Sequence, residues 1–368
     1  MSGPASLRLQ PLDYEDLQGF GADDHLAAFR CFERSARALV RLEGGTRTAR
    51  PPSPALVAAA GSALASGATD GIDARRFFEA LFRPFRIVPD PPDAGFLTGY
   101  YEPCVQGSPV ETDAFCWPIL ARPPDLVGLA PGETPPGFPE GVSGARRRGD
   151  GSLVPYDDRR TIEREQRSPI VWLRDAVEAF LIQVQGSAQI EFADGRRARL
   201  AYDGRNGLPY TSIGRILTET GEIAESAMSL ESLKAWLRAA GLSEGERGLE
   251  LMRRNRSFVF FRLIEDFDAR LGPVAGAGVA LTPLRSIAVD KTIWSYGLPF
   301  WIEADLPWAD EALRPFRRLM IAQDTGSAIV GPARADIFFG SGDAAGARAG
   351  AIRHQGAFAV LLPVGDEP

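Results

Sequence analysis

Three aspartates near the C-terminus stand in surroundings that could support acid–base chemistry. Asp324 follows an apolar run, Asp336 lies within Ala335-Asp336-Ile337-Phe338-Phe339, and Asp343 follows Gly342. Apolar surroundings disfavour the charged form of a carboxyl and so raise its pKa. Asp336 has the most apolar neighbours, and we expect its pKa to be raised most. A carboxyl that stays neutral near pH 7 can donate a proton.

Each aspartate could instead have a structural role. An acid that accepts backbone N–H bonds at a buried turn has a lowered pKa. Asp324, flanked by Gln323 and Thr325, fits this alternative better than Asp336 does. Asp343 lies in a glycine-rich bend, where it either caps a turn or faces a substrate.

Two motifs in this region resemble other kinds of site. Asp324-Thr325-Gly326 matches half of an aspartic protease site, but such a site needs two carboxylates that share a proton, and the chain has no second Asp-Ser/Thr-Gly. Two identical chains could supply it at an interface, which is improbable for a chain this long. The run Gly340–Gly346 does not match G-x-G-x-x-G and has no Lys-Ser/Thr for a P-loop. We therefore expect a bend beside the site there.

Composition limits the remaining classes. The 368 residues, 45% hydrophobic and 24% charged, describe a globular chain long enough for two domains. The net charge of -7 argues against nucleic acid as a partner. A histidine-rich metal site is excluded because His25 and His354 are the only histidines, and the three cysteines lack paired C-x-x-C spacing. We expect no metal and no cofactor.

Cys104 and Cys116 could form a disulfide, but isolated thiols are the favoured interpretation. The chain has no run of about 18 apolar residues. Its first residues, Met1 to Ser6, contain no charged segment followed by an apolar one, so the sequence shows no export signal.

Helices are expected early in the chain and strands later. Hydrophobic spacing and cap residues predict helices over 23–40, from Ser53-Pro54 onward, over 73–82 and over 229–240. Alternation predicts a hairpin of 188–192 and 197–202 around Asp194-Gly195. Further strands are expected at 257–262, 286–289, 299–304, 318–322 and 358–362. The proline-dense segment 122–139 is typical of a surface loop.

A second cluster could bind a sugar. Thr98, Tyr100 and Tyr101 follow one another closely around Gly99, and aromatic faces beside polar groups suit a ring with apolar faces and polar edges. Further polar partners are Gln183, Gln185 and Ser187. Tyrosines of a structural core would give the same pattern.

Taken together, these segments resemble the membrane-bound lytic murein transglycosylase A (MltA) family from about Gly95 to Leu362. The matching pieces, in order, are Leu97-Thr98-Gly99-Tyr100-Tyr101-Glu102-Pro103, Gln183-Val184-Gln185-Gly186-Ser187, Tyr202-Asp203-Gly204-Arg205-Asn206-Gly207, Asn255–Phe261, Leu281–Asp290, Ala322–Gly326 and Ala335–Gly340.

The resemblance implies a mainly β fold with N-terminal helices, in which a double-psi β-barrel domain carries a second, smaller inserted β-barrel domain. Residues 1–105 plus 250–368 would form the helical part and the catalytic barrel, and 106–249 the insert that makes the other wall of a glycan groove. The family's catalytic acid falls on Asp336, with Asp324 as its supporting neighbour. Seven residues would bind substrate: Thr98, Tyr100, Tyr101, Gln183, Gln185, Ser187 and Asp343.

The resemblance also implies a peptidoglycan lytic exotransglycosylase whose partners are glycan strands. It would act as a monomer in the periplasm or cell envelope, with peripheral or lipid-anchored association with the outer membrane. One carboxyl suffices, because the C6 hydroxyl of MurNAc can attack C1 in place of water. An inverting hydrolase would need a second carboxylate at roughly 6.5 to 9.5 Å to activate water, and a retaining one would need a nucleophile at about 5 to 5.5 Å. Asp324 or Asp343 could supply either. A noncatalytic wall-binding module is the remaining alternative.

Overall fold

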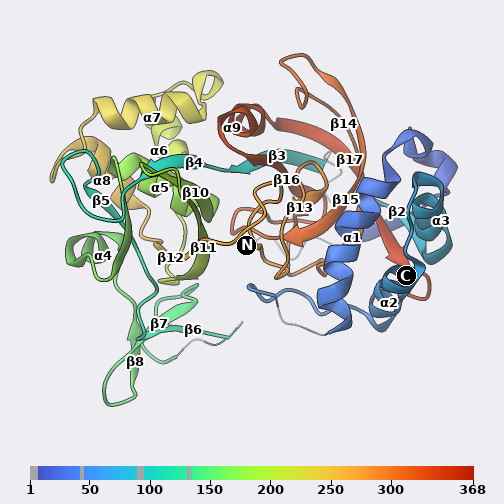
Figure 1. Ribbon diagram of the computed structural model, residues 1–368, viewed down its shortest axis with the longest axis horizontal. Helices are drawn as coiled ribbons and strands as arrows, with labels where there is room; N and C mark the ends of the chain where they lie inside the picture. The colour runs from blue at the N-terminus through green and yellow to red at the C-terminus, as the bar shows by residue number, and fades with distance from the viewer. Residues whose placement is uncertain (1–6, 42–44, 89–94, 131–132, 134) are drawn as a thin grey trace. The chain divides into compact units, whose positions relative to one another are not determined.

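The computed structural model describes residues 7–41, 45–88, 95–130, 133 and 135–368. The chain forms two compact units, one of Met1–Tyr101 with Asp268–Pro368 and the other of Glu102–Phe267. The first is drawn in blue to teal and in orange to red in Figure 1, and the second in teal through green to yellow. Among the helices of the described residues, none is both long and apolar enough to cross a lipid bilayer.

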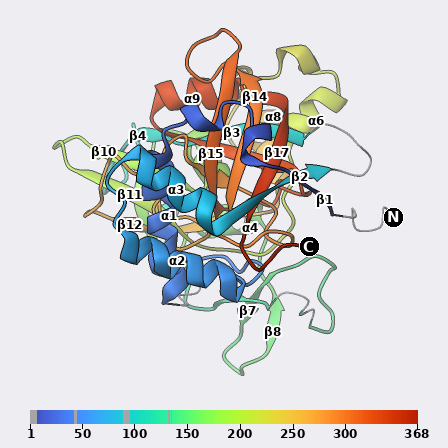
Figure 2. The ribbon, with the colours of Figure 1, turned by 90° about the vertical axis from the view of Figure 1, so that its right-hand side faces the viewer.

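Three capped helices open the first unit, as the sequence predicted. They are α1 (His25–Val40), α2 (Pro54–Ser66) and α3 (Gly71–Leu81). The side chains of Asp24, Ser53 and Asp70 each accept backbone N–H bonds of the first turn, which sets where the helices begin. The third helix starts earlier than predicted because Asp70 is its cap. The helices lie together against one side of the sheet (Figure 2).

Six strands of the first unit close into a barrel. They are β3 (Gly95–Glu102), β13 (Ser286–Ala288), β14 (Pro299–Leu306), β15 (Arg314–Asp324), β16 (Arg334–Ser341) and β17 (Arg353–Pro363). Their order is β17-β14-β15-β13-β16-β3, and β3 pairs again with β17. β2 (Phe82–Val88) and β1 (Arg8–Pro11) continue the sheet outward from β17. This barrel, the N-terminal helices and the second unit confirm the predicted fold class.

Aromatic side chains fill the space between the helices and the sheet. Phe29 and Phe32 of α1 meet Phe77 and Phe78 of α3, with ring centroids 5.0 to 6.0 Å apart. Phe82, the first residue of β2, joins them edge-on to Phe32 at 5.7 Å. Such tilted and edge-on contacts add to the free energy of burial.

The second unit holds three small sheets and five α-helices within the described residues. The sheets have the orders β12-β11-β10-β4, β5-β9 and β6-β7-β8. The strands are β4 (Cys104–Gly107), β5 (Trp117–Leu120), β6 (Leu126–Gly128), β7 (Gly144–Arg147), β8 (Leu153–Pro155), β9 (Pro169–Leu173), β10 (Ser187–Phe192), β11 (Arg197–Arg205) and β12 (Val259–Ile264). The helices are α4 (Arg159–Glu165), α5 (Ala176–Gln185), α6 (Ile213–Glu219), α7 (Leu230–Ala239) and α8 (Arg247–Arg254).

Several local predictions are confirmed in this unit. β10 and β11 form the expected antiparallel hairpin, with Gly195 at φ 82° in its turn. Ser229 caps α7. Cys104 and Cys116 do not form a disulfide. The expected loop 122–139 is wrong in one part, because β6 lies within it and pairs with β7; residues 131–132 and 134 of that loop lie outside the described residues.

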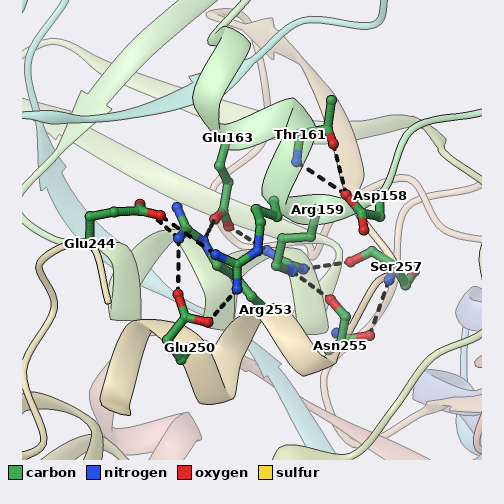
Figure 3. A network of polar contacts seen from close by, with 10 residues as sticks. Asp158, Arg159, Thr161, Glu163, Glu244, Glu250, Arg253, Asn255 and Ser257 are labelled. Carbon is green, nitrogen blue, oxygen red and sulfur yellow. Dashed lines mark hydrogen bonds and ion pairs between the residues drawn. The ribbon is translucent and has the colours of Figure 1, made fainter. Parts of the chain in front are cut away.

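A buried ionic network joins α4 to the segment between α8 and β12 (Figure 3). Arg159, 2% exposed, donates to the backbone oxygens of Asn255 and Ser257 at 2.8 and 2.6 Å. Glu163 accepts from Arg159 at 3.3 Å and from Arg253 at 3.0 Å. Because these buried charges are paired and hydrogen-bonded, they tie segments far apart in sequence together without an unpaired charge.

Candidate active site

Strand β3 presents two hydroxyl groups to two different acids. Thr98 and Tyr100 are two residues apart, so their side chains leave the same face of the strand. The Thr98 hydroxyl donates to Oδ1 of Asp336 at 2.6 Å, and the Tyr100 hydroxyl donates to Oδ2 of Asp324 at 3.1 Å. The structure thus brings together four of the residues that the sequence singled out.

The two acids lie level with one another on the strands that flank β13. Ala288 pairs with Asp324 in the parallel ladder to β15 and with Asp336 in the antiparallel ladder to β16. A bulge between Ile287 and Ala288 interrupts the ladder to β15 just before Asp324. Both carboxyls nevertheless meet hydroxyls from one face of β3. Two strand spacings place their backbones about 10 Å apart.

Burial raises the pKa of Asp336 to about 6. The charge of Asp324 adds to this rise, whereas the hydrogen bond from Thr98 and the charge of Arg334 oppose it. The raised pKa agrees with the expectation from the apolar sequence around Asp336. With this pKa the carboxyl holds a proton up to about pH 6. Because the residue stays partly exposed, that carboxyl can still meet a substrate.

Asp324 is held by more groups. Its Oδ1 accepts the backbone N–H of Gly276 at 3.0 Å, and Nη1 of Arg47 lies 4.0 Å from the same oxygen. With Tyr100 on Oδ2, both oxygens accept a hydrogen bond. A hydrogen bond from a backbone N–H is the kind of contact expected if Asp324 has a structural role. Gly276 fits closely, because a Cβ there would lie 2.5 Å from the Tyr296 hydroxyl and 3.1 Å from Oδ1 of Asp324.

The residue before Asp324 fixes the end of β15. Gln323 is fully buried, and its Oε1 accepts from Ser286 at 2.5 Å and from the Cys31 thiol at 3.3 Å. Its Nε2 donates to the backbone oxygen of Cys31 and to Ser35, both on α1, at 2.9 and 2.8 Å. A buried amide whose hydrogen bonds are satisfied stabilises one arrangement, so α1 holds the strand that carries Asp324.

The chain is similar to known proteins in sequence and in fold. A family model described as the MltA specific insert domain matches residues 96–262, and one described as the 3D domain matches residues 285–362. The crystal structure of a membrane-bound lytic murein transglycosylase from Agrobacterium tumefaciens is 35% identical, with a TM-score of 0.86 over 97% of this chain and 98% of that one. The chain belongs to the MltA family.

Other MltA proteins align over smaller shares or at lower identity. Membrane-bound lytic murein transglycosylase A of Escherichia coli K12 is 32% identical over 273 residues, which is 72% of this chain and 65% of the relative. The chain therefore spans slightly less than two thirds of that curated relative. A crystal structure of E. coli MltA with bound chitohexaose is 25% identical, with a TM-score of 0.66 over 99% of this chain.

The other residues expected from the MltA resemblance are not in this cluster of contacts. Tyr101 is 8% exposed, and its ring packs against Gly346 of α9 (Asp343–Gly350). Asp343 is exposed in the first turn of that helix. The segment 340–346 is thus a bend only at its start, where Gly340 and Gly342 have positive φ, and then becomes helical.

Three expected residues belong to the second unit. Gln183 and Gln185 lie in the last turn of α5, and Ser187 begins β10. Gln183 is 7% exposed and Ser187 3%, whereas Gln185 is partly exposed. Oε1 of Gln183 is buried and accepts no hydrogen bond from the part of the chain that the structure describes.

Sequence reasoning missed Arg334, Arg47, Gly276 and Tyr296. Arg334 had a detectable signal, since it stands two residues before Asp336 on one strand and so shares its face. Arg47 and Gly276 lie 277 and 48 residues from Asp324 in sequence, and nothing in their local pattern indicates that contact.

Proposed function

We propose that the chain is a lytic murein transglycosylase that cleaves the β-1,4 bond between MurNAc and GlcNAc of peptidoglycan. The observation that carries the proposal is the Asp336 carboxyl, whose pKa is raised to about 6 and whose hydrogen-bond partner is a neutral hydroxyl. Family membership gives the substrate class, because relatives are named lytic murein transglycosylases. The chitohexaose in E. coli MltA, a β-1,4-linked oligosaccharide, supports a glycan of this linkage.

One carboxyl performs both proton transfers in this mechanism. Protonated Asp336 donates to the glycosidic oxygen, and the bond from C1 of MurNAc to that oxygen breaks. The carboxylate left behind takes the proton of the MurNAc C6 hydroxyl as the hydroxyl oxygen bonds to C1. The products are a 1,6-anhydro-MurNAc end and a free GlcNAc hydroxyl, and Asp336 is protonated again without water.

The Asp324 carboxyl is held in place by its contacts. Its Oδ1 accepts the backbone N–H of Gly276, and its Oδ2 accepts the Tyr100 hydroxyl. A carboxylate fixed in this way can act on a nearby acid through its charge. We therefore assign Asp324 to support of Asp336, through the charge that helps to keep the Asp336 pKa high.

Substrate-binding roles are part of the same proposal. They fall on Thr98, Tyr100, Tyr101, Gln183, Gln185, Ser187 and Asp343. The names of the relatives also support a location in the cell envelope. We propose that the enzyme works there as a monomer, held at the outer membrane peripherally or by a lipid anchor.

Purified murein sacculi test the proposal. The full chain is incubated with sacculi, and the soluble products are analysed by mass spectrometry. Anhydro-muropeptides are expected. Hydrated muropeptides, heavier by one water, would identify a hydrolase. Binding to sacculi without soluble products would identify a noncatalytic polysaccharide-binding module.

A further inference from the structure

Arg334 reaches Asp336 through a threonine. Nη2 of Arg334 donates to Oγ1 of Thr98 at 2.8 Å, and the same Thr98 oxygen lies 2.6 Å from Oδ1 of Asp336. A guanidinium has only donors, whereas a hydroxyl has one hydrogen and two lone pairs. The Thr98 oxygen must therefore accept from Arg334, which directs its single hydrogen toward Asp336.

The guanidinium is itself held in place. Its Nη1 donates to the backbone oxygen of Ala335 at 2.5 Å. Its carbon lies 5.3 Å from the centre of the Phe96 ring, and Phe96 shares the face of β3 that carries Thr98. With two hydrogen bonds and a ring contact, Arg334 has little freedom to turn away from Thr98.

The two hydrogen bonds from Arg334 to Thr98 and from Thr98 to Asp336 form a relay. Its direction distinguishes the two oxygens of Asp336. Because Oδ1 accepts the Thr98 hydrogen, a proton that binds Asp336 without displacing this bond resides on Oδ2. We infer that Arg334 is a positioning residue, which commits the Thr98 hydroxyl to Oδ1 and leaves Oδ2 as the oxygen that delivers and recovers the catalytic proton. This role rests on the proposed function, in which Asp336 transfers the proton.

Other charged and titratable groups near Asp336 also influence its pKa and must stay constant in a test. Asp324 of β15 and Tyr100 of β3 interact electrostatically with it, and Arg47 lies beside Asp324. Arg353 of β17, which pairs with Thr98 in register, is exposed. These groups stay unchanged when only Arg334 and Thr98 are varied.

The test measures the pKa of Asp336 by carboxyl ¹³C NMR in the 368-residue chain labelled at aspartate. The resonance is identified by its loss in Asp336→Asn. Arg334→Met and Thr98→Val are each expected to raise this pKa, by about one pH unit or less. Thr98→Val should have a smaller effect in the Arg334→Met background than alone. Thr98→Ser and Arg76→Met, an exposed control, should leave the pKa unchanged.

An unchanged pKa in Arg334→Met would overturn the inference, and so would an equal effect of Thr98→Val in both backgrounds. Arg334→Lys retains a donor and a charge, and it should restore most of the wild-type pKa if Arg334→Met is poorly folded. In sacculus assays Arg334→Met should lower kcat about ten- to a hundred-fold with little change in KM. The NMR measurement does not need cleavage. It therefore tests the relay even if the wild-type protein releases no anhydro-muropeptides, which is the result that would contradict the proposed function.

Discussion

Asp324 and Asp336 stand opposite the same residue, Ala288, on the two strands beside β13, yet their side chains have different partners. Within the described residues, Asp336 accepts from one hydroxyl, whereas Asp324 accepts from a hydroxyl and a backbone N–H and lies near an arginine. Two carboxyls in unlike surroundings can take unlike roles. The proposed proton donor, Asp336, is the one with fewer groups that stabilise its charged form.

Replacement of Asp336 by asparagine should abolish cleavage and spare binding. The amide keeps the shape of the side chain but cannot deliver and recover a proton, so we expect the rate of anhydro-muropeptide release to fall about a thousand-fold. Co-sedimentation with sacculi should be unchanged. Asp113→Asn, at an exposed position, is the matched control. Full activity of Asp336→Asn would remove the assignment of Asp336 as catalytic acid.

The pH dependence of cleavage should report the same group. The free enzyme needs protonated Asp336, whose pKa lies at about 6. Consequently kcat/KM should decline as pH rises through 6, approaching a tenfold loss per pH unit. Initial rates on soluble glycan strands between pH 4.5 and 8 measure this. A profile that stays flat to pH 8 would contradict the role of Asp336 as donor.

The raised pKa also predicts that the catalytic acid costs stability. The unfolded carboxyl ionises near its ordinary value of 3.8, but the folded one ionises only near 6. Between these values the unfolded state releases its proton first, so the free energy of unfolding falls as pH rises and then levels off above 6. The asparagine of Asp336→Asn does not titrate, so the free energy of unfolding of this variant does not fall for this reason.

Relative to wild type, Asp336→Asn should therefore gain stability between pH 4 and pH 7, by at most about 3 kcal/mol. Urea unfolding at the two pH values measures the gain. Asp113→Asn should show none, since its side chain is exposed. An equal stability difference between Asp336→Asn and wild type at both pH values would mean that burial does not perturb this carboxyl.

Much of the strand framework could be predicted because its signals are local. The five segments expected to be strands from 257 onward are all strands, since each has an apolar or β-branched run between turn residues. The apolar neighbours of Asp336 likewise predicted its raised pKa. Strand β6 was missed because its three residues stand among prolines and owe their conformation to pairing with β7.

The surroundings of the acids could be predicted only in part. The alternation of Arg334 and Asp336 on one strand would have indicated a shared face. The approach of Gly276 to Asp324, however, depends on a chain path that no local pattern encodes. Helix α9 was also hidden, because its glycine- and alanine-rich sequence resembles a bend. Sequence thus identified the acids better than the groups that hold them.

The close fit at Gly276 predicts that a substitution there lowers activity and that a second substitution restores part of it. Alanine there would bring Cβ to 2.5 Å from the Tyr296 hydroxyl and 3.1 Å from Oδ1 of Asp324, so one of them must move. We expect Gly276→Ala to displace Asp324 and to lower cleavage about tenfold. Tyr296→Phe removes the buried hydroxyl, which has no hydrogen-bond partner among the described residues, and should restore part of the activity in the double variant. Gly61→Ala, in open space within α2, is the control and should be fully active. Because the closest contact is with that hydroxyl, a double variant no better than Gly276→Ala alone would show that the loss does not arise from this contact.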